Sequence, residues 1–327
     1  MEQKAIDEQY MHRCVQIAAY GRMESRPNPM VGCVIVAPQA VDAHVLPAAM
    51  PSGLPGRIIG EGWHVRCGEG HAEVNALASV QDADKWLLPQ STVYVSLEPC
   101  AHYGKTPPCA DLLVSKGVRR VVVGCVDPFA RVQGRGIEKL RSAGIDVTVG
   151  VCEEECEWLN RRFFTFHRKG RPYIILKWAQ SSNGFLDDNG KAVAFSTPLT
   201  QMLVHKLRAE EDAILVGRVT AEREHPRLDV RHWHGPAPAR FVLSHEHPWE
   251  EVLQQCRQRQ LQSLIVEGGG RTLQWFLEQD LWDEIRVETS PKTVVSGTPV
   301  PALPNSPRKE LTYHADGNAI RIFYSSS

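Results

Sequence analysis

The stretch that decides the fold of this chain reads His71-Ala72-Glu73-Val74-Asn75-Ala76-Leu77-Ala78, and Pro99-Cys100 and Pro108-Cys109 complete it downstream. One imidazole, two thiolates and a nearby carboxylate that does not bind the metal are what a catalytic zinc site requires. Three protein ligands leave the fourth position open, so that the ion lowers the pKa of a water there to ~7. The pattern therefore predicts hydrolysis of a C–N bond.

The same stretch predicts a helix over 73–78, whose first turn points His71 and Glu73 toward one metal ion. Glu73 would take a proton from the water and deliver it to the leaving amine, which is general acid–base work. The two cysteines flank a polar loop, 101–108, that follows a predicted strand over 92–97. A strand that leads into this loop, together with the predicted helix, fits an α/β unit.

A structural zinc site, or no metal at all, is the alternative, because His and Cys are often buried for packing and a lone His-x-Glu is weak evidence. The combination is more specific, since each cysteine follows a proline and the histidine opens a helix. The other cysteines are scattered, several of them in apolar runs, and we expect them to act as small hydrophobic residues. This expectation covers six of the seven cysteines outside the predicted metal site: Cys14, Cys33, Cys125, Cys152, Cys156 and Cys256.

Composition limits the setting of this chemistry. A length of 327 residues predicts two domains, each large enough for its own core. A net charge of −1 gives no overall attraction to nucleic acid or to an anionic membrane, so an anionic substrate must be met locally. Nine cysteines without an apolar N-terminal leader favour a reducing cytoplasm. No stretch approaches the ~20 apolar residues of a membrane span.

Strands and helices alternate along the chain, which predicts an α/β fold in both halves. The first domain is expected over 1–150, a linker helix lies within 151–171, and the second domain covers 172–327. The second domain is expected to hold a parallel-type sheet with ligands at the carboxyl ends of its strands. A Pro- and Gly-rich segment over 37–56 predicts a surface hairpin loop without chemistry.

Glu267-Gly268-Gly269-Gly270 directly follows an apolar strand and leads into a helix. Backbone N–H groups and a helix N-terminus in that arrangement can receive a phosphate. A plain turn is the alternative, since a glycine run after a strand is common.

Beyond these features, the chain resembles the bifunctional deaminase–reductase family of riboflavin biosynthesis over nearly its whole length. The first half matches it in 27–32, 62–64, 70–73 and 98–109, and the second half matches it in 208–209, 212–217, Thr220, 226–231 and 267–269. Eight residues separate Cys100 from Cys109, whereas cytidine and transfer-RNA deaminases usually have two at that place.

The resemblance implies a cytidine-deaminase-like α/β/α domain followed by a dihydrofolate-reductase-like α/β domain. It implies hydrolytic deamination of a diaminohydroxy-phosphoribosylaminopyrimidine, then NADPH-dependent reduction of its ribosyl group to ribityl. By the same resemblance, His71, Cys100 and Cys109 bind Zn²⁺, and Glu73 moves protons. The substrate residues would be Asn28, His64, His102, Lys105 and Thr106 in the first half and Arg208, Leu228, Arg231 and Glu267 in the second. The NADPH residues would be Ala179, Thr220, Glu224, Gly269, Gly270, Arg271 and Thr272.

The chemistry of these residues is compatible with such roles, because Arg offers a two-pronged donor to a sugar phosphate. Other interpretations stay open: a surface charge for Arg208 and Arg231, a hydrogen-bonded loop histidine for His64 and His102, and a turn for Asn28.

Several positions depart from the family pattern. Asn183 and Glu224 stand where the family usually has Asp, a Trp usual before Pro198 is missing near Ala194, and the segment between Phe241 and Leu264 is shorter. An alternative is therefore an active deaminase with the second domain as an inactive scaffold. A nucleic-acid base deaminase would need an electropositive groove, against which the near-neutral charge argues. We expect a small phosphorylated pyrimidine substrate, no nucleic-acid or membrane partner, and a homo-oligomer.

Overall fold

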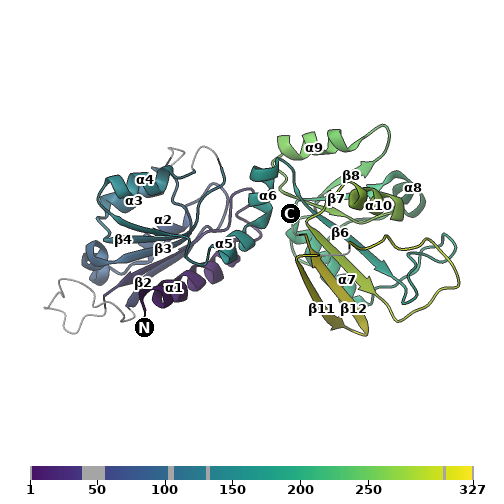
Figure 1. Cartoon of the computed structure of the whole chain (residues 1–327), viewed down its shortest axis with the longest axis horizontal. Coiled ribbons are helices and arrows are strands. Elements are labelled where there is room, and N and C mark those ends of the chain that lie inside the picture. The colour runs from purple at the N-terminus through teal and green to yellow at the C-terminus, as the bar shows by residue number, and fades with distance from the viewer. Residues whose placement is uncertain (1, 39–55, 102–106, 130–132, 305–306, 326–327) are drawn as a thin grey trace. The chain divides into compact units, whose positions relative to one another are not determined.

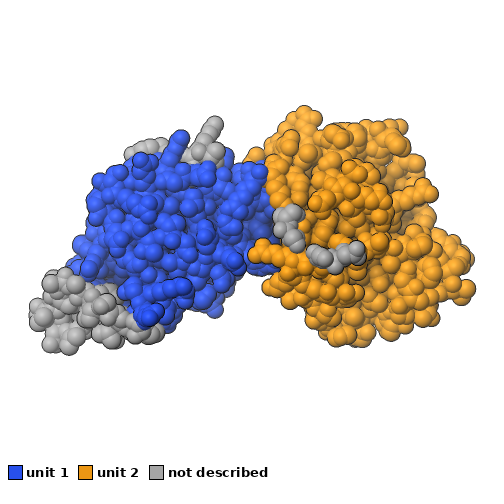
Figure 2. All heavy atoms as spheres, viewed as in Figure 1, with its two compact units in different colours: residues 1–168 blue, residues 169–327 orange. Residues whose placement is uncertain are grey.

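The computed structural model describes residues 2–38, 56–101, 107–129, 133–304 and 307–325 (Figure 1). The chain divides into two compact units, Met1–Arg168 and Lys169–Ser327, coloured blue and orange in Figure 2. Each unit is built around its own sheet. None of the helices among the described residues combines the length and apolar composition needed to cross a lipid bilayer.

The described residues of the first unit form a five-stranded sheet in the order β2-β1-β3-β4-β5. The strands are β1 (Gly32–Ala37), β2 (Arg57–Trp63), β3 (Thr92–Leu97), β4 (Arg120–Cys125) and β5 (Asp146–Val149). The helices are α1 (Gln3–Ala18), α2 (Ala72–Ser79), α3 (Cys109–Ser115), α4 (Arg135–Ser142), α5 (Glu153–Leu159) and α6 (Arg161–Lys169), with 3-10 segments η1 (Ala19–Gly21) and η2 (Asp82–Gln90). β1 is antiparallel to β2 and β3, whereas β3, β4 and β5 are parallel.

Helices cover both faces of this sheet, which explains why its strands are nearly continuous apolar runs. α2, α3 and α4 pack on one face against residues such as Val95 and Val123. α1, α5 and α6 pack on the other against Val34 and Val122. The result is the predicted α/β/α sandwich (Figure 1). β5 was not predicted, because this short strand is only partly buried. Most of the predicted surface hairpin, 39–55, lies outside the described residues.

One close contact places the start of α2 at the edge of the sheet. Gly62 in β2 lies against α2 so tightly that a Cβ there would come within 2.3 Å of the backbone nitrogen of Ala76 and 2.8 Å of the carbonyl oxygen of Ala72. Any side chain at this position would push the helix away. The glycine thus lets α2 bring His71 and Glu73 to the end of the sheet.

The prediction of a single linker helix within 151–171 was wrong: the segment forms two helices, α5 and α6, with a break at Asn160. The buried Asn160 side chain accepts a hydrogen bond from the backbone nitrogen of Met30 and donates one to its carbonyl oxygen, both at 2.8 Å. This tertiary contact decides the break, and sequence periodicity does not report it. Both helices pack into the first unit through Cys156 and Phe163. The domain limits 1–150, 151–171 and 172–327 stay predictions.

The described residues of the second unit form a seven-stranded sheet in the order β11-β12-β10-β6-β9-β7-β8. The strands are β6 (Tyr173–Gln180), β7 (Ala213–Gly217), β8 (Ala239–Leu243), β9 (Ser263–Val266), β10 (Glu284–Thr289), β11 (Lys309–Ala315) and β12 (Asn318–Tyr324). The helices are α7 (Pro198–Glu210), α8 (Arg218–Glu224), α9 (Trp249–Gln258) and α10 (Gly270–Glu278). α9 and α10 pack on one face and α7 on the other.

The parallel arrangement predicted for this sheet holds for β10, β6, β9, β7 and β8. The hairpin of β11 and β12 extends the sheet in antiparallel pairing and was not predicted. β8 was also missed. Both β8 and β11 are edge strands in which at most one residue is buried, so neither is the long buried apolar run on which the prediction depended.

Candidate active sites

Three predicted ligands meet at one end of the first sheet. His71 immediately precedes α2, Cys100 lies beyond the carboxyl end of β3, and Cys109 begins α3. The Nδ1 atom of His71 lies 3.5 Å from the Sγ of Cys100 and 3.4 Å from the Sγ of Cys109. Among the described residues this is the one group of three His, Cys, Asp or Glu side chains found close enough to share a metal ion.

This spacing fits zinc, because nitrogen and sulfur ligands bound tetrahedrally at about 2.0–2.3 Å lie about 3.5 Å apart. The donor set of one imidazole and two thiolates fits as well. The hydrogen bond with Cys109, and then that with His71, lowers the pKa of the Cys100 thiol well below its usual range. The backbone N–H of Cys109 also donates to the Sγ of Cys100 at 3.3 Å. The site thus favours the thiolate that a zinc ion requires.

Glu73 lies one residue into α2 and is 3% exposed. Burial, followed by the negative charge of Cys100, raises the pKa of Glu73 to about 7. Its side chain is also hydrogen-bonded to Cys109, so it lies beside the metal ligands. A buried carboxyl in this place is suited to accept and return a proton.

Asn28 and His64 lie together next to the ligands. The ring of His64 meets the ring of His71 edge to face, with centroids 5.4 Å apart. The Nδ1 of His64 is 3.1 Å from the carbonyl oxygen of Gly70, so Nδ1 carries the hydrogen, and Nε2 accepts from the Nδ2 of Asn28, also at 3.1 Å. Burial lowers the pKa of His64. The pair therefore forms a fixed, neutral wall. His102, Lys105 and Thr106 lie outside the described residues.

Sequence patterns did not indicate two residues that hold this wall in place. Asn75 in α2 donates from Nδ2 to the carbonyl oxygens of Trp63 and Gly70, at 2.7 and 3.1 Å. The Asn160 side chain is hydrogen-bonded to both the backbone N–H and the carbonyl oxygen of Met30, two residues beyond Asn28. A polar residue in an apolar helix was the only available signal for Asn75, and no signal existed for Asn160.

The second unit contains a cavity of about 890 Å³ at the carboxyl ends of β6, β9, β7 and β8. All seven residues predicted to bind NADPH line it: Ala179, Thr220, Glu224, Gly269, Gly270, Arg271 and Thr272. The segment predicted to be cut down, between Phe241 and Leu264, still includes the ten-residue helix α9, and β8 pairs with β7 along its full length. The cavity is thus bounded on the side of β8 and α9.

The glycine turn before α10 forms the floor of the cavity, and side chains would fill it. Gly268 has a φ of +113°, a conformation that favours glycine. A Cβ on Gly269 would lie 2.8 Å from the Oγ1 of Thr220. Because a dinucleotide phosphate needs close backbone approach, the bare turn fits NADPH.

Of the four predicted substrate residues of the second unit, Glu267 alone is among the residues that line this cavity. Glu267 lines the cavity and forms a two-pronged ion pair with Arg208, at 3.0 and 2.6 Å. Burial raises the pKa of Glu267, but the hydrogen bond from Arg208 outweighs it, and the pKa is lowered. Leu228 is buried in an apolar cluster with Leu207 and Val216, and Arg231 pairs with Asp229, so the structure does not bring these two residues to the cavity lining.

Two further polar residues line the cavity and were not predicted. Lys177, in β6, presents an ammonium group there, and its charge lowers the pKa of Glu267. Asp187 lines the cavity from the loop after β6. The departure Asn183 makes two hydrogen bonds with the backbone of Val294. Glu224, the other departure, pairs with Arg223.

Comparison with known proteins identifies the family of each unit. Residues 4–125 match the cytidine and deoxycytidylate deaminase zinc-binding region, and residues 172–251 and 247–312 match the RibD C-terminal domain. The riboflavin biosynthesis protein RibD of Aquifex aeolicus is 34% identical, over 90% of this chain and 89% of that protein. The Escherichia coli RibD protein is 42% identical, over 69% of this chain and 56% of that protein.

Two solved structures match nearly the whole length of the chain. The Thermotoga maritima diaminohydroxyphosphoribosylaminopyrimidine deaminase/5-amino-6-(5-phosphoribosylamino)uracil reductase has a TM-score of 0.81 and 29% identity, covering 98% of this chain and 99% of that chain. Acinetobacter baumannii RibD also has a TM-score of 0.81, at 27% identity and with 99% of both chains covered. These matches confirm the predicted fold class.

The two sites and their folds define the class of the protein, a zinc-dependent deaminase joined to an NADPH-dependent reductase. Within that class the chain belongs to the RibD family of riboflavin biosynthesis proteins.

Proposed function

We propose that the first unit removes an amine by hydrolysis from a diaminohydroxy-phosphoribosylaminopyrimidine, and that the second reduces the ribosyl group of the product to ribityl. The meeting of His71, Cys100 and Cys109 beside the buried Glu73 carries the deaminase part. The match to the Thermotoga maritima deaminase/reductase supports this substrate.

In the first unit, His71, Cys100 and Cys109 would hold the zinc ion, which supplies an activated water when bound. Glu73 accepts a proton from that water and returns it to the leaving amine. The Asn28–His64 pair would orient the pyrimidine ring through the remaining oxygen of the Asn28 amide. We propose His102, Lys105 and Thr106 as further substrate residues.

In the second unit, NADPH supplies the hydride, and the turn over Gly268, Gly269 and Gly270 would receive its phosphates. Lys177 and the Arg208–Glu267 pair lie at the β6 side of the cavity, where an ammonium group can donate a proton to the reduced substrate. Arg231 and Leu228 are proposed as outer substrate contacts.

A coupled assay on the phosphoribosyl-pyrimidine, which scores ammonia release and NADPH consumption separately, tests both parts. We expect one NADPH consumed for each ammonia released, and a zinc chelator should abolish both signals when the pyrimidine is supplied. Chelated protein supplied with deaminated product should still consume NADPH. Ammonia release without NADPH consumption would reject the reductase half and leave the scaffold alternative.

We propose that the chain forms a homo-oligomer. The strand β11 supports this, because it stands at the end of the described strand order and its Leu311 and Tyr313 are each 41% exposed. Light scattering at several concentrations tests it, and a monomer mass throughout would reject it.

We further propose a cytoplasmic location. All nine cysteines fall within the described residues and are free thiols, which fits a reducing compartment. Cell fractionation tests this location.

A further inference from the structure

Two segments of the second unit, 183–189 and 294–300, pair with each other beside the cavity, and we call them the paired ribbon. Their backbone hydrogen bonds run from Leu186 to Thr298, from Asn189 to Ser296 and from Val300 to Gly184, at 2.9, 3.0 and 3.1 Å. The two segments lie more than a hundred residues apart in the sequence. The ribbon therefore exists through tertiary pairing alone.

The paired ribbon forms a wall of the cavity next to the glycine turn. Leu186, Asp187 and Thr298 all line the cavity. A Cβ on Gly270 would lie 3.2 Å both from the Cδ1 of Leu186 and from the Cγ2 of Thr298. The ribbon thus packs directly on the first residue of α10, and its position sets the width of the space above the turn.

One buried carboxylate holds the two strands of the paired ribbon together. Asp187 is 4% exposed. Its Oδ1 accepts from the backbone nitrogens of Gly190 and Thr298 at 2.9 and 3.0 Å, and its Oδ2 accepts from the hydroxyl of Thr298 at 2.6 Å. Burial raises the pKa of Asp187, but these hydrogen bonds, led by the Thr298 hydroxyl, outweigh it, so the pKa lies below its usual value.

The contact between the two segments leaves no room for a side chain at position 297. A Cβ on Gly297 would come within 2.1 Å of the carbonyl oxygen of Asp187 and 2.9 Å of its Oδ1. Thr298 can therefore reach the carboxylate only because the preceding residue has no side chain. A displaced ribbon would lose the three hydrogen bonds together.

We propose that Asp187 is a positioning residue for NADPH, because its carboxylate holds Thr298 and thereby fixes the wall that closes on the dinucleotide above the Gly268–Gly270 turn. This rests on the proposed assignment of the cavity to NADPH. The carboxylate acts through the paired ribbon: its oxygens are engaged by Gly190 and Thr298, and a carboxylate aimed at the anionic cofactor would repel it.

The first test is a titration of the purified full chain with NADPH, followed by nicotinamide fluorescence. Asp187→Ala removes the acceptor for three donors, and we expect a Kd about tenfold higher or more. Asp187→Asn keeps the shape: Oδ1 can still accept from both backbone nitrogens, and the amide can donate to the Thr298 hydroxyl. We expect this variant to remain within about threefold of wild type.

Asp188→Ala is the matched control, because Asp188 is the neighbouring acid whose Oδ1 accepts from the side chain of Asn189 and does not line the cavity. Its Kd should equal that of wild type. In steady-state assays, Asp187→Ala should raise KM for NADPH while KM for the pyrimidine substrate and the ammonia-releasing activity of the first unit stay unchanged.

An alanine variant that binds NADPH as tightly as wild type would overturn the proposal. So would an asparagine variant as weak as the alanine variant, because asparagine keeps the hydrogen bonds through which Asp187 is proposed to hold the ribbon. Should the alanine variant not fold, Thr298→Val removes only the hydroxyl donor and should raise Kd about threefold; no change would again reject the role. A wild-type chain without saturable NADPH binding would instead reject the assignment of the cavity.

Discussion

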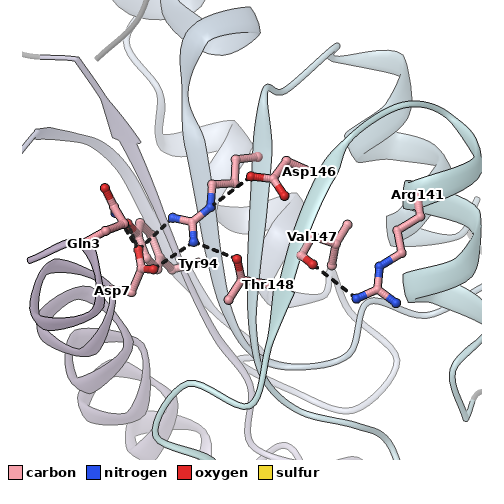
Figure 3. Close-up of polar contacts among 8 residues, drawn as sticks. Gln3, Asp7, Tyr94, Arg141, Asp146, Val147 and Thr148 are labelled. Carbon is pink, nitrogen blue, oxygen red and sulfur yellow. Dashed lines mark hydrogen bonds and ion pairs between the residues drawn. The ribbon is translucent and has the colours of Figure 1, made fainter. Parts of the chain in front are cut away.

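Each end of the first sheet has a buried carboxylate beside it, but the groups that surround the two carboxylates differ. At the end where β4 begins, Asp7 of α1 is 3% exposed and accepts two hydrogen bonds from Arg120, at 2.8 Å each, and one from Tyr94 at 2.9 Å. Figure 3 shows Gln3 and Tyr94 converging on Asp7, with Thr148 on β5 nearby. At the other end, Glu73 is equally buried but lies beside cysteine sulfurs.

The electrostatic consequence differs accordingly. Burial raises the pKa of Asp7, but hydrogen bonds from Arg120 and Gln3 outweigh it, so the pKa of Asp7 falls below its usual value. Burial raises the pKa of Glu73 to about 7, and its neighbours do not reverse the shift. The difference teaches that a buried carboxylate paired with an arginine is suited to stabilising the fold, whereas one buried beside cysteine sulfurs keeps a raised pKa, which suits proton transfer.

The largest expected effect comes from Glu73→Gln, which removes the proton carrier. We expect kcat for ammonia release to fall by about 10²–10⁴-fold, the range of general acid–base catalysis. Zinc content, measured by elemental analysis, should stay at one ion per chain, and heat resistance of the first unit should not fall, since a neutral amide is buried more cheaply than a carboxylate. Substantial remaining turnover would reject the role of Glu73.

Asp7→Asn should have the opposite profile. It leaves Arg120 without its buried partner, so the free energy of unfolding of the first unit should fall by about 3 kcal/mol. Denaturant unfolding followed by loss of deaminase activity measures this. kcat and KM at low temperature should match wild type, because Asp7 lies at the end of the sheet remote from the zinc ligands. A kinetic defect would break the comparison.

Acidic pH should reduce the stabilisation that Asp7 contributes to the first unit. Asp7 faces Gln3 on its own helix, Tyr94 on β3 and Arg120 on β4, which also lies 3.5 Å from Asp146. Because the pKa of folded Asp7 is lowered, its stabilisation is complete above the unfolded pKa of ~4 and is lost as pH falls through the folded pKa. The melting temperature of the first unit should drop in that range, and Asp7→Asn should reduce the drop. An identical pH profile in both proteins would count against the role of Asp7.

The smallest effect should come from Thr148→Val. Thr148 accepts one hydrogen bond from Arg120 at 2.7 Å, and its loss should cost about 1 kcal/mol. Arg141→Ala serves as its control, because the exposed Arg141 makes only a 3.2 Å contact with the carbonyl oxygen of Val147. That control should change the free energy of unfolding by less than about 0.5 kcal/mol. An equal loss of unfolding free energy in both variants would show that the hydrogen bonds of Arg120 contribute no more to stability than an exposed contact does.

Much of the site was predictable because its residues are close in sequence or have unusual chemistry. His71, Cys100 and Cys109 were predicted as ligands, and the structure brings them together. The glycine run 268–270 was also indicated, since it interrupts a strand–helix pattern. Asn160 and Asp187 were not, because each acts through a partner more than a hundred residues away. Their environment, and no local pattern, distinguishes them from ordinary loop and helix residues.

The amino-acid sequence by itself determined the alternation of strands and helices, and it was enough to predict the zinc ligands and Glu73, because periodicity and side-chain chemistry are local properties. The tertiary structure alone decided the break at Asn160, the hairpin of β11 and β12, and the pairing of 183–189 with 294–300. It also decided which buried carboxylate would be neutralised by partners and which would keep a raised pKa. The physical reason is that desolvation and hydrogen bonding depend on what packs around a group, and those neighbours come from distant parts of the chain.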